Sequence, residues 1–77
     1  MFHSEYNYSI VEEIAVISQR GSTTKELNIV SHNHESPKYD IRAWNRDGDE
    51  RKMLRGISLT ADEARALKQA LNERTEL

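Results

Sequence analysis

An alternation in the middle of the chain constrains the fold more than any other feature of the sequence. In segment 38–44, one parity carries Tyr39, Ile41 and Ala43. The other parity carries Lys38, Asp40, Arg42 and Trp44. Because successive side chains of a β-strand point to opposite faces of a sheet, this period of two predicts a half-buried strand.

Trp44 shares its predicted face with two cations, Lys38 and Arg42. A flat aromatic ring beside cations on an exposed sheet face can stack an unpaired base while the cations contact phosphates. We therefore expect Trp44 to face outward as a base platform. Two alternatives stay open: Trp44 folds over the strand end to cover the core, or Asp40 simply pairs with one of the cations on a solvated face.

The flanking segments also have the character of strands. Tyr8–Ser18 is rich in β-branched residues but apolar on both parities, so it is either covered on both faces or interrupted by a bulge near Glu12 and Glu13. Two further strands are expected at Lys25–Asn33 and Arg51–Ser58. The predicted turns between the strands contain Gly21, the segment His34–Pro37, and the hairpin signal Asp47-Gly48.

The C-terminal segment predicts one helix that begins at a capping box and runs to about Arg74. Thr60 and Glu63 have the spacing that lets each side chain bond the other's backbone N–H group. Ala64, Leu67 and Leu71 then form a narrow apolar stripe. The sequence therefore predicts an α+β fold: a four-stranded antiparallel curved sheet followed by one C-terminal helix, in the order β-β-β-β-α.

The size of the chain favours association with a second copy. Its 77 residues predict one domain, residues 8–77, preceded by a loose arm, residues 1–7. Only 36% of the residues are hydrophobic and none is cysteine, so the core is small and has no disulfide to support it. We expect a homodimer in a reducing, cytoplasmic compartment, with nucleoid association left open. No apolar run predicts a membrane span or a signal peptide.

Charge is unevenly distributed along the chain, although the net value is −2. Residues 1–19 carry −3, residues 20–56 carry +2, and residues 57–77 carry −1. The basic excess therefore coincides with the strands that carry the candidate binding residues. Because this excess is small, binding to a polyanion by charge alone would be weak and sensitive to salt.

The enzyme hypothesis has little support in the sequence. His32, His34 and Glu35 lie close together, but no third strong ligand stands at a spacing that predicts a metal site. No nucleophile–base pair, paired carboxylates or glycine-rich phosphate loop is recognisable. We expect a protein without catalytic activity, metal or cofactor.

Several of these segments together resemble a known family. The residues that carry the resemblance are Lys25-Glu26-Leu27-Asn28, Val30-Ser31, Pro37 to Arg42, Trp44, Lys52-Met53 and Gly56-Ile57-Ser58-Leu59-Thr60. They resemble the bacterial YdbC family, whose members are relatives of the C-terminal domain of the eukaryotic transcriptional coactivator positive cofactor four. The resemblance spans about residues 8–72.

The resemblance implies a homodimer whose helices pack at the subunit interface and whose curved β-ribbons bind single-stranded DNA with little sequence preference. It implies a role in transcription regulation or in handling single-stranded DNA. The implied nucleic-acid-binding residues are Lys25, Asn28, Lys38, Arg42, Trp44, Lys52 and Arg55, and His32 is a further candidate.

Two departures from the family pattern remove stacking surface. Thr23 stands where an aromatic residue is expected in the first turn, and His32 stands where bacterial relatives tend to have a second tryptophan. Stacking contributes about 1–3 kcal/mol per base, so weaker binding is expected here. The alternatives are a protein-interaction dimer that does not bind nucleic acid and an RNA-binding module.

Overall fold

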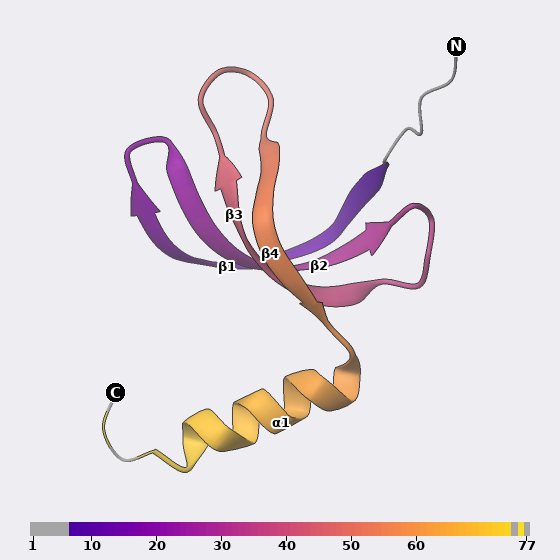
Figure 1. Cartoon of the computed structure of the whole chain (residues 1–77), viewed down its shortest axis with the longest axis vertical. Coiled ribbons are helices and arrows are strands. Elements are labelled where there is room, and N and C mark those ends of the chain that lie inside the picture. Colours follow the sequence, from indigo (N-terminus) through magenta and orange to yellow (C-terminus); the bar gives the residue numbers. More distant parts are fainter. Residues whose placement is uncertain (1–6, 75, 77) are drawn as a thin grey trace.

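The computed structural model describes residues 7–74 and 76. It consists of one antiparallel sheet with strand order β1-β2-β3-β4, followed by one helix, so the predicted order β-β-β-β-α is confirmed (Figure 1). The elements are β1 Tyr8–Arg20, β2 Thr23–His32, β3 Lys38–Asn45, β4 Lys52–Leu59 and α1 Ala61–Asn72. The predicted arm lies outside the described residues, except for Asn7, whose backbone N–H donates to Asn33 Oδ1 at 2.9 Å.

Two glycines make the predicted hairpins possible. Gly21 has a φ of 60° in the turn between β1 and β2, and Gly48 has a φ of 93° between β3 and β4. L-residues with a Cβ atom rarely adopt these angles. The Asp47 N–H also donates to Asn45 Oδ1 at 2.8 Å, which supports the second turn locally.

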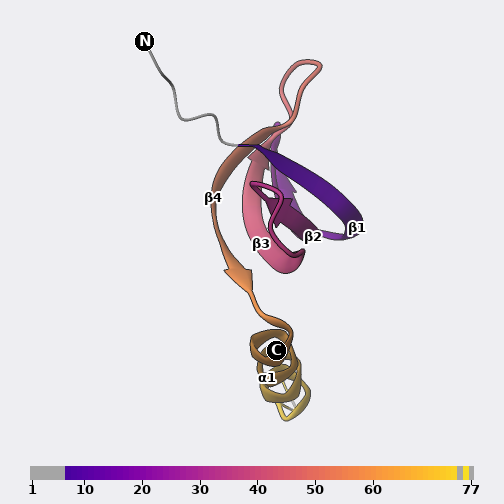
Figure 2. The same cartoon turned by 90° about the vertical axis from the view of Figure 1, so that its right-hand side faces the viewer.

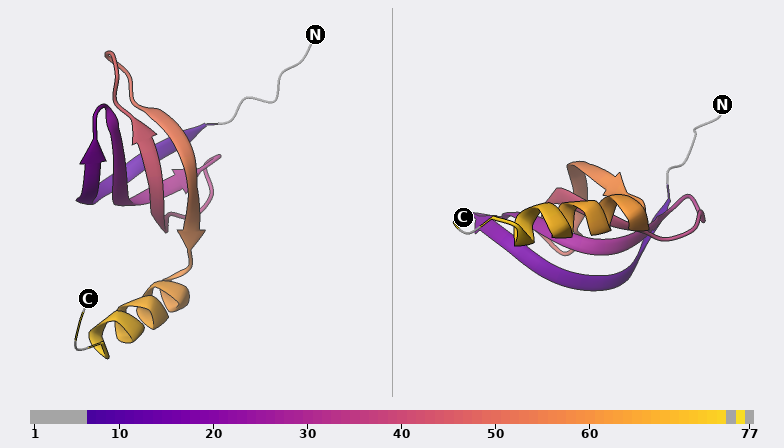
Figure 3. Two further views of the ribbon diagram at one scale, coloured as in Figure 1. Left: turned by 60° about the vertical axis from the view of Figure 1, so that its left-hand side comes forward. Right: turned by 90° about the horizontal axis from the view of Figure 1, so that it is seen from below.

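β1 is bent by three irregularities in its pairing with β2. The register shifts between Ile10 and Glu12, between Glu13 and Ala15, and between Val16 and Ser18, so the predicted bulge near Glu12 and Glu13 is confirmed. Each extra residue in one strand bends that strand and increases its twist. The first half of β1 consequently runs across the other strands (Figure 3, left).

The curvature encloses one face of the sheet, which we call the inner face. Its fully buried residues alternate along β2 and β3: Thr24, Glu26, Asn28, Val30, Asp40 and Trp44. Only two of these six are hydrophobic. The interior of the isolated chain is therefore mainly polar, and its stability depends on how well those polar groups are paired.

The opposite, outer face of the sheet is apolar and largely uncovered. α1 begins with the predicted capping box, in which Glu63 N–H donates to Thr60 Oγ1 and Thr60 N–H donates to Glu63 Oε1. It ends at Asn72, two residues before the predicted end. Figures 1 and 2 show the helix standing beyond the end of β4, and none of its residues is buried.

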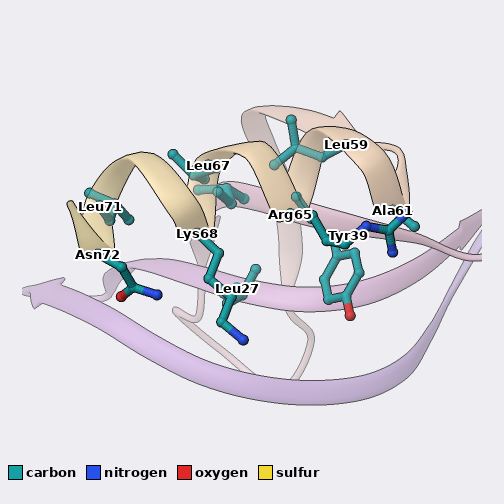
Figure 4. Close-up of a pocket in the computed structure, with 11 residues that line it drawn as sticks. Leu27, Tyr39, Leu59, Ala61, Arg65, Leu67, Lys68, Leu71 and Asn72 are labelled. Carbon is teal, nitrogen blue, oxygen red and sulfur yellow. The ribbon is translucent and has the colours of Figure 1, made fainter.

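A groove of about 440 Å³ separates the helix from the sheet (Figure 4). The outer-face residues that line it are Leu27, Tyr39, Ile41 and Leu59, and the apolar helix residues are Ala61, Ala64, Leu67 and Leu71. The apolar stripe of α1 predicted from the sequence is therefore present, but an open groove lies between it and the sheet. Within the described residues, no helix is long and apolar enough to cross a membrane.

Candidate nucleic-acid interface

Trp44 does not face outward, so the prediction of an exposed base platform is wrong for this conformation. The ring is fully buried on the inner face. The Tyr8 ring lies 5.5 Å from it between centroids, at an interplanar angle of 56°, and the Arg51 guanidinium carbon lies 5.2 Å from its centroid. The parity of Trp44 was predicted correctly, but the bulges of β1 bring Tyr8 across that face and close it.

Arg42 is also directed into the inner face rather than into solvent. Its Nε donates to Asp40 Oδ1 at 2.6 Å and its Nη2 to Asp40 Oδ2 at 2.8 Å, a forked pair that leaves the Arg42 side chain only 12% exposed. Its Nη1 donates to the Leu54 carbonyl at 3.1 Å. The expected pairing of Asp40 with a neighbouring cation is therefore present, but the face that carries it is buried and not solvated as that alternative supposed.

Gly56 makes this position of Arg42 possible. The two residues lie opposite each other in the pairing of β3 with β4. A Cβ atom on residue 56 would lie 1.9 Å from the Cβ atom of Arg42 and 2.5 Å from its Cα atom. Any side chain at this position would therefore displace one strand from the other.

Asp40 is the centre of a buried polar cluster at one end of the inner face. Ser58 Oγ donates to Asp40 Oδ2 at 3.0 Å, and His32 Nε2 lies 3.2 Å from the same oxygen. Burial raises the pKa of Asp40, but the hydrogen bonds and charge of Arg42 and the contacts of Ser58 and His32 outweigh it, so the pKa is lowered.

Ser58, His32 and Asp40 do not form a catalytic triad, although all three meet. Ser58 Oγ lies 3.1 Å from His32 Nε2, the same ring nitrogen that contacts Asp40. In a triad the acid holds one ring nitrogen so that the other can take the nucleophile's proton. Among the described residues no group of three or more histidine, cysteine or acidic side chains has the arrangement of a metal site.

Glu26 organises the other end of the inner face. It accepts hydrogen bonds from Thr24 Oγ1 at 2.5 Å, Arg46 Nε at 2.8 Å and Asn28 Nδ2 at 3.2 Å. Arg51 Nη1 lies 3.6 Å from Glu26 Oε1. Burial raises the pKa of Glu26, but these hydrogen bonds and the charge of Arg51 together lower it to about 2.

A second carboxylate lies on the solvent side of the same two arginines. Arg51 Nη2 donates to Glu13 Oε1 at 2.8 Å, and Arg46 Nη2 lies 3.6 Å from that oxygen. The hydrogen bond and charge of Arg51 lower the pKa of Glu13. We refer to Glu13, Glu26, Arg46 and Arg51 as the arginine–glutamate cluster.

This cluster was not predicted from the sequence, because Arg46 and Arg51 flank the β3–β4 turn among acidic residues, where charged side chains are usually exposed. One signal could have revealed it. Glu26 shares its parity with Asn28 and Val30 on β2, and a carboxylate on a buried face requires cationic partners. The nearest cations beyond the end of the neighbouring strand are the two that the structure brings in.

The structure brings half of the candidate binding residues together and separates the rest. Asn28, His32, Arg42 and Trp44 lie on the inner face, where each is buried or half-buried. The other candidates are exposed: Lys25, Lys38, Lys52 and Arg55.

Those exposed cations occupy different parts of the sheet. Lys25 pairs with Ala43, whose parity belongs to the outer face, and Lys38 pairs with Val30 on the inner face. Lys52 pairs with Asn45 at the start of β4. Arg55 lies where the register of β3 and β4 shifts. A ligand that contacts all four would have to follow the curved sheet over a long path.

The chain is similar to a known family and to a bacterial protein. A family model described as Transcriptional Coactivator p15 (PC4) matches residues 20–70, about two thirds of the chain. A protein of Treponema pallidum (strain Nichols), itself uncharacterised, is 35% identical over 71 residues, which cover 91% of this chain and 81% of that protein. The matched range contains β2, β3, β4 and most of α1. The finer resemblance to the bacterial YdbC family stays a prediction.

Proposed function

The chain belongs to the PC4 family of transcriptional coactivators, and from this premise we propose that it binds single-stranded DNA as a homodimer with little sequence preference. Its role would lie in transcription regulation or in handling unpaired strands, without bond-making chemistry. The observation that carries the proposal is the family match over residues 20–70, because this range includes every candidate binding residue.

The two faces of the sheet support the homodimer. Among the described residues, Val30 and Trp44 are the only fully buried hydrophobic side chains. The outer face meanwhile presents an apolar groove, with Leu67 and Leu71 of α1 still 40% and 46% exposed. Fully burying a leucine side chain contributes about 1.5–3 kcal/mol. A second copy whose helix covers this groove would supply the apolar burial that one copy lacks.

The exposed cations would contact the phosphates of a bound strand. Lys25, Lys38, Lys52 and Arg55 project from a curved sheet whose inner-face cations are already paired with carboxylates. Contacts to the backbone alone give binding without sequence readout and with strong dependence on salt. Stacking of a base on Trp44 requires Tyr8 and Arg51 to move away from the ring first.

A titration with fluorescein-labelled oligo-dT tests the proposal. Anisotropy should rise with protein concentration, and the affinity should fall as salt is added. Trp44 is the only tryptophan in the sequence, so its fluorescence reports separately whether the inner face opens on binding. No rise in anisotropy at low salt and high protein concentration would overturn the proposal and favour the protein-interaction dimer. Competition by oligo-U distinguishes RNA from DNA as the preferred ligand.

A further inference from the structure

The arginine–glutamate cluster contains an anion site that the protein fills with its own carboxylate. We propose that Glu13 occupies, on Arg46 and Arg51, the position of a phosphodiester group, and that a bound strand displaces it. This inference rests on the proposed binding of single-stranded DNA. It adds Arg46 and Arg51 to the candidate phosphate contacts. It also identifies the Glu13 carboxylate as the group that blocks these arginines in the unbound protein.

Glu26 keeps both arginines in place from the inside. Its carboxylate is fully buried and held by Thr24 and Asn28, while it contacts Arg46 at 2.8 Å and Arg51 at 3.6 Å. Because these contacts do not involve Glu13, they remain when Glu13 leaves. The two guanidinium groups therefore stay oriented for a second anion, and fixed guanidinium groups bind phosphate well.

Glu13 is the replaceable member of the cluster. Its side chain is 64% exposed, and it contacts Arg51 at 2.8 Å but Arg46 only at 3.6 Å. Ion pairs exposed to this degree contribute little to stability. Separating Glu13 from the arginines therefore costs little free energy. Separating Glu26 from them would cost much more, because the Glu26 carboxylate would stay buried without its cationic partners.

Two buried donors beside the cluster form no close hydrogen bond, although one of them, Arg51 Nη1, lies 3.6 Å from Glu26 Oε1. Arg51 Nη1 and Trp44 Nε1 have no hydrogen-bond partner in the described part of the chain. Buried polar atoms in proteins usually have a partner, which can be a protein group, a water molecule or a bound ligand. Arg51 Nη1 faces Glu26, whereas Nη2 faces Glu13, so a phosphate in the position of Glu13 contacts Arg51 through Nη2.

The position of Glu13 is a better phosphate site than the neighbouring cavity. That cavity, of about 240 Å³, is lined by Arg46, Gly48, Asp49, Glu50 and Arg51. Its two acidic residues repel an anion, and phosphate there would face like charges at short range. At the existing carboxylate position the charge of Glu26 also opposes an anion, but the hydrogen bond and charge of Arg51 and the charge of Arg46 outweigh it, because the pKa of Glu13 is lowered.

Displacement of Glu13 also removes a link between β1 and the β3–β4 hairpin. These segments are not neighbours in the sheet. Contacts between them include the Glu13–Arg51 pair, the longer Glu13–Arg46 pair, and the contacts of Tyr8 with Arg51 and Trp44. The Tyr8 hydroxyl donates to the Arg51 carbonyl at a long 3.4 Å. Loss of the Glu13 contact therefore removes one of the links that hold β1 against the β3–β4 hairpin beside Trp44.

The test compares Glu13→Gln with Glu12→Gln, which removes the same charge from the neighbouring residue. Glu12 is exposed and forms no ion pair within the described residues. Oligo-dT should bind Glu13→Gln about 3- to 10-fold more tightly than wild type, and Glu12→Gln about twofold more tightly at most. Equal affinities for the two variants would overturn the inference and leave the proposed function intact.

The salt dependence gives a second readout with a different physical basis. In wild type, a phosphate that binds the two arginines displaces Glu13, and the freed carboxylate attracts a cation from solution. This uptake offsets the cations released from the DNA, so the net release of cations is small. In Glu13→Gln that compensation is absent, and the slope of log K against log salt should steepen by about 0.7, the value for one phosphate of a single strand. An unchanged slope would contradict displacement.

A titration with inorganic phosphate separates failure of this inference from failure of the proposed function. The Nε–Hε NMR signals of Arg46 and Arg51 should shift with phosphate in Glu13→Gln at lower concentrations than in wild type. This result would support the anion site even if no variant binds oligo-dT. Signals that stay unchanged in Glu13→Gln would overturn the site, whatever the DNA titration shows.

Discussion

The two faces of the sheet invert the usual arrangement of a small protein. The inner face is closed but mainly polar, with Glu26 and Asp40 buried among their arginine partners. The outer face is apolar but open, with a groove between sheet and helix. Buried ion pairs contribute to a defined geometry more than to stability, whereas apolar burial supplies the main favourable free energy. The inner face therefore orients charged groups, while most of the available stability depends on what covers the outer face.

The largest expected effect is on the outer face, from Leu67→Asp. If a second copy covers the groove, each dimer loses the burial of two leucines, about 3–6 kcal/mol, and dissociates at micromolar concentration. Sedimentation velocity should show monomers. Leu54→Asp is the matched control, since Leu54 is also 40% exposed but does not line the groove. If the wild-type chain were monomeric at 100 μM, the outer face would not be covered by a second copy, and the contrast drawn between the two faces would be refuted.

On the inner face, Glu26→Gln should have the next largest effect. It leaves Arg46 and Arg51 without their buried counter-charge, and breaking a buried ion pair in this way costs about 3–5 kcal/mol. Urea denaturation at pH 7 and fixed protein concentration measures the loss. The exposed Glu13→Gln variant is the control and should change the urea midpoint little.

The same carboxylate predicts how stability depends on pH. The folded pKa of Glu26 is about 2, below its usual value of 4.5. Its contribution is therefore complete above pH 4.5 and is lost as the pH falls from 4.5 to 2. The shift corresponds to about 3 kcal/mol. Wild type and Glu26→Gln should differ in unfolding free energy at pH 6 and converge towards pH 2; a constant difference would contradict this assignment.

Gly56→Ala should destabilise the chain by about 3 kcal/mol, at the upper end of the range for overpacking, because the new Cβ overlaps Arg42 and its backbone. The forked pair of Arg42 with Asp40 would be displaced as well. Arg55→Ala, at the preceding exposed position, should change the urea midpoint little. If Gly56→Ala proved as stable as wild type, the close approach of β3 and β4 would be refuted.

The smallest effect is expected from an exposed candidate contact. Arg55→Gln should weaken oligo-dT binding about two- to fivefold and reduce the slope of log K against log salt by about 0.7. Arg74→Gln, beyond the C-terminal end of α1, should leave both quantities unchanged apart from the general loss of one charge. Equal effects of the two substitutions would mean that Arg55 contributes only to the net charge.

Local sequence determined the elements of this protein. The capping box of Thr60 and Glu63 and the Asp47-Gly48 hairpin depend on residues a few positions apart, so they could be read directly. The parity of β3 correctly placed Arg42 and Trp44 on one face. The apolar positions on both parities of β1 left two alternatives open, coverage on both faces or a bulge, and the structure shows the bulge.

Only the tertiary structure decided which face of the sheet is closed. The parity of a strand states which side chains share a face of the sheet. Whether that face is exposed depends on what packs against it. Here Tyr8 packs against Trp44, although it lies 36 residues away in the sequence. The same long-range bending brought Glu13 to Arg46 and Arg51. Burial and ion pairing result from contacts between distant segments, whereas the pattern of one strand contains only its own alternation.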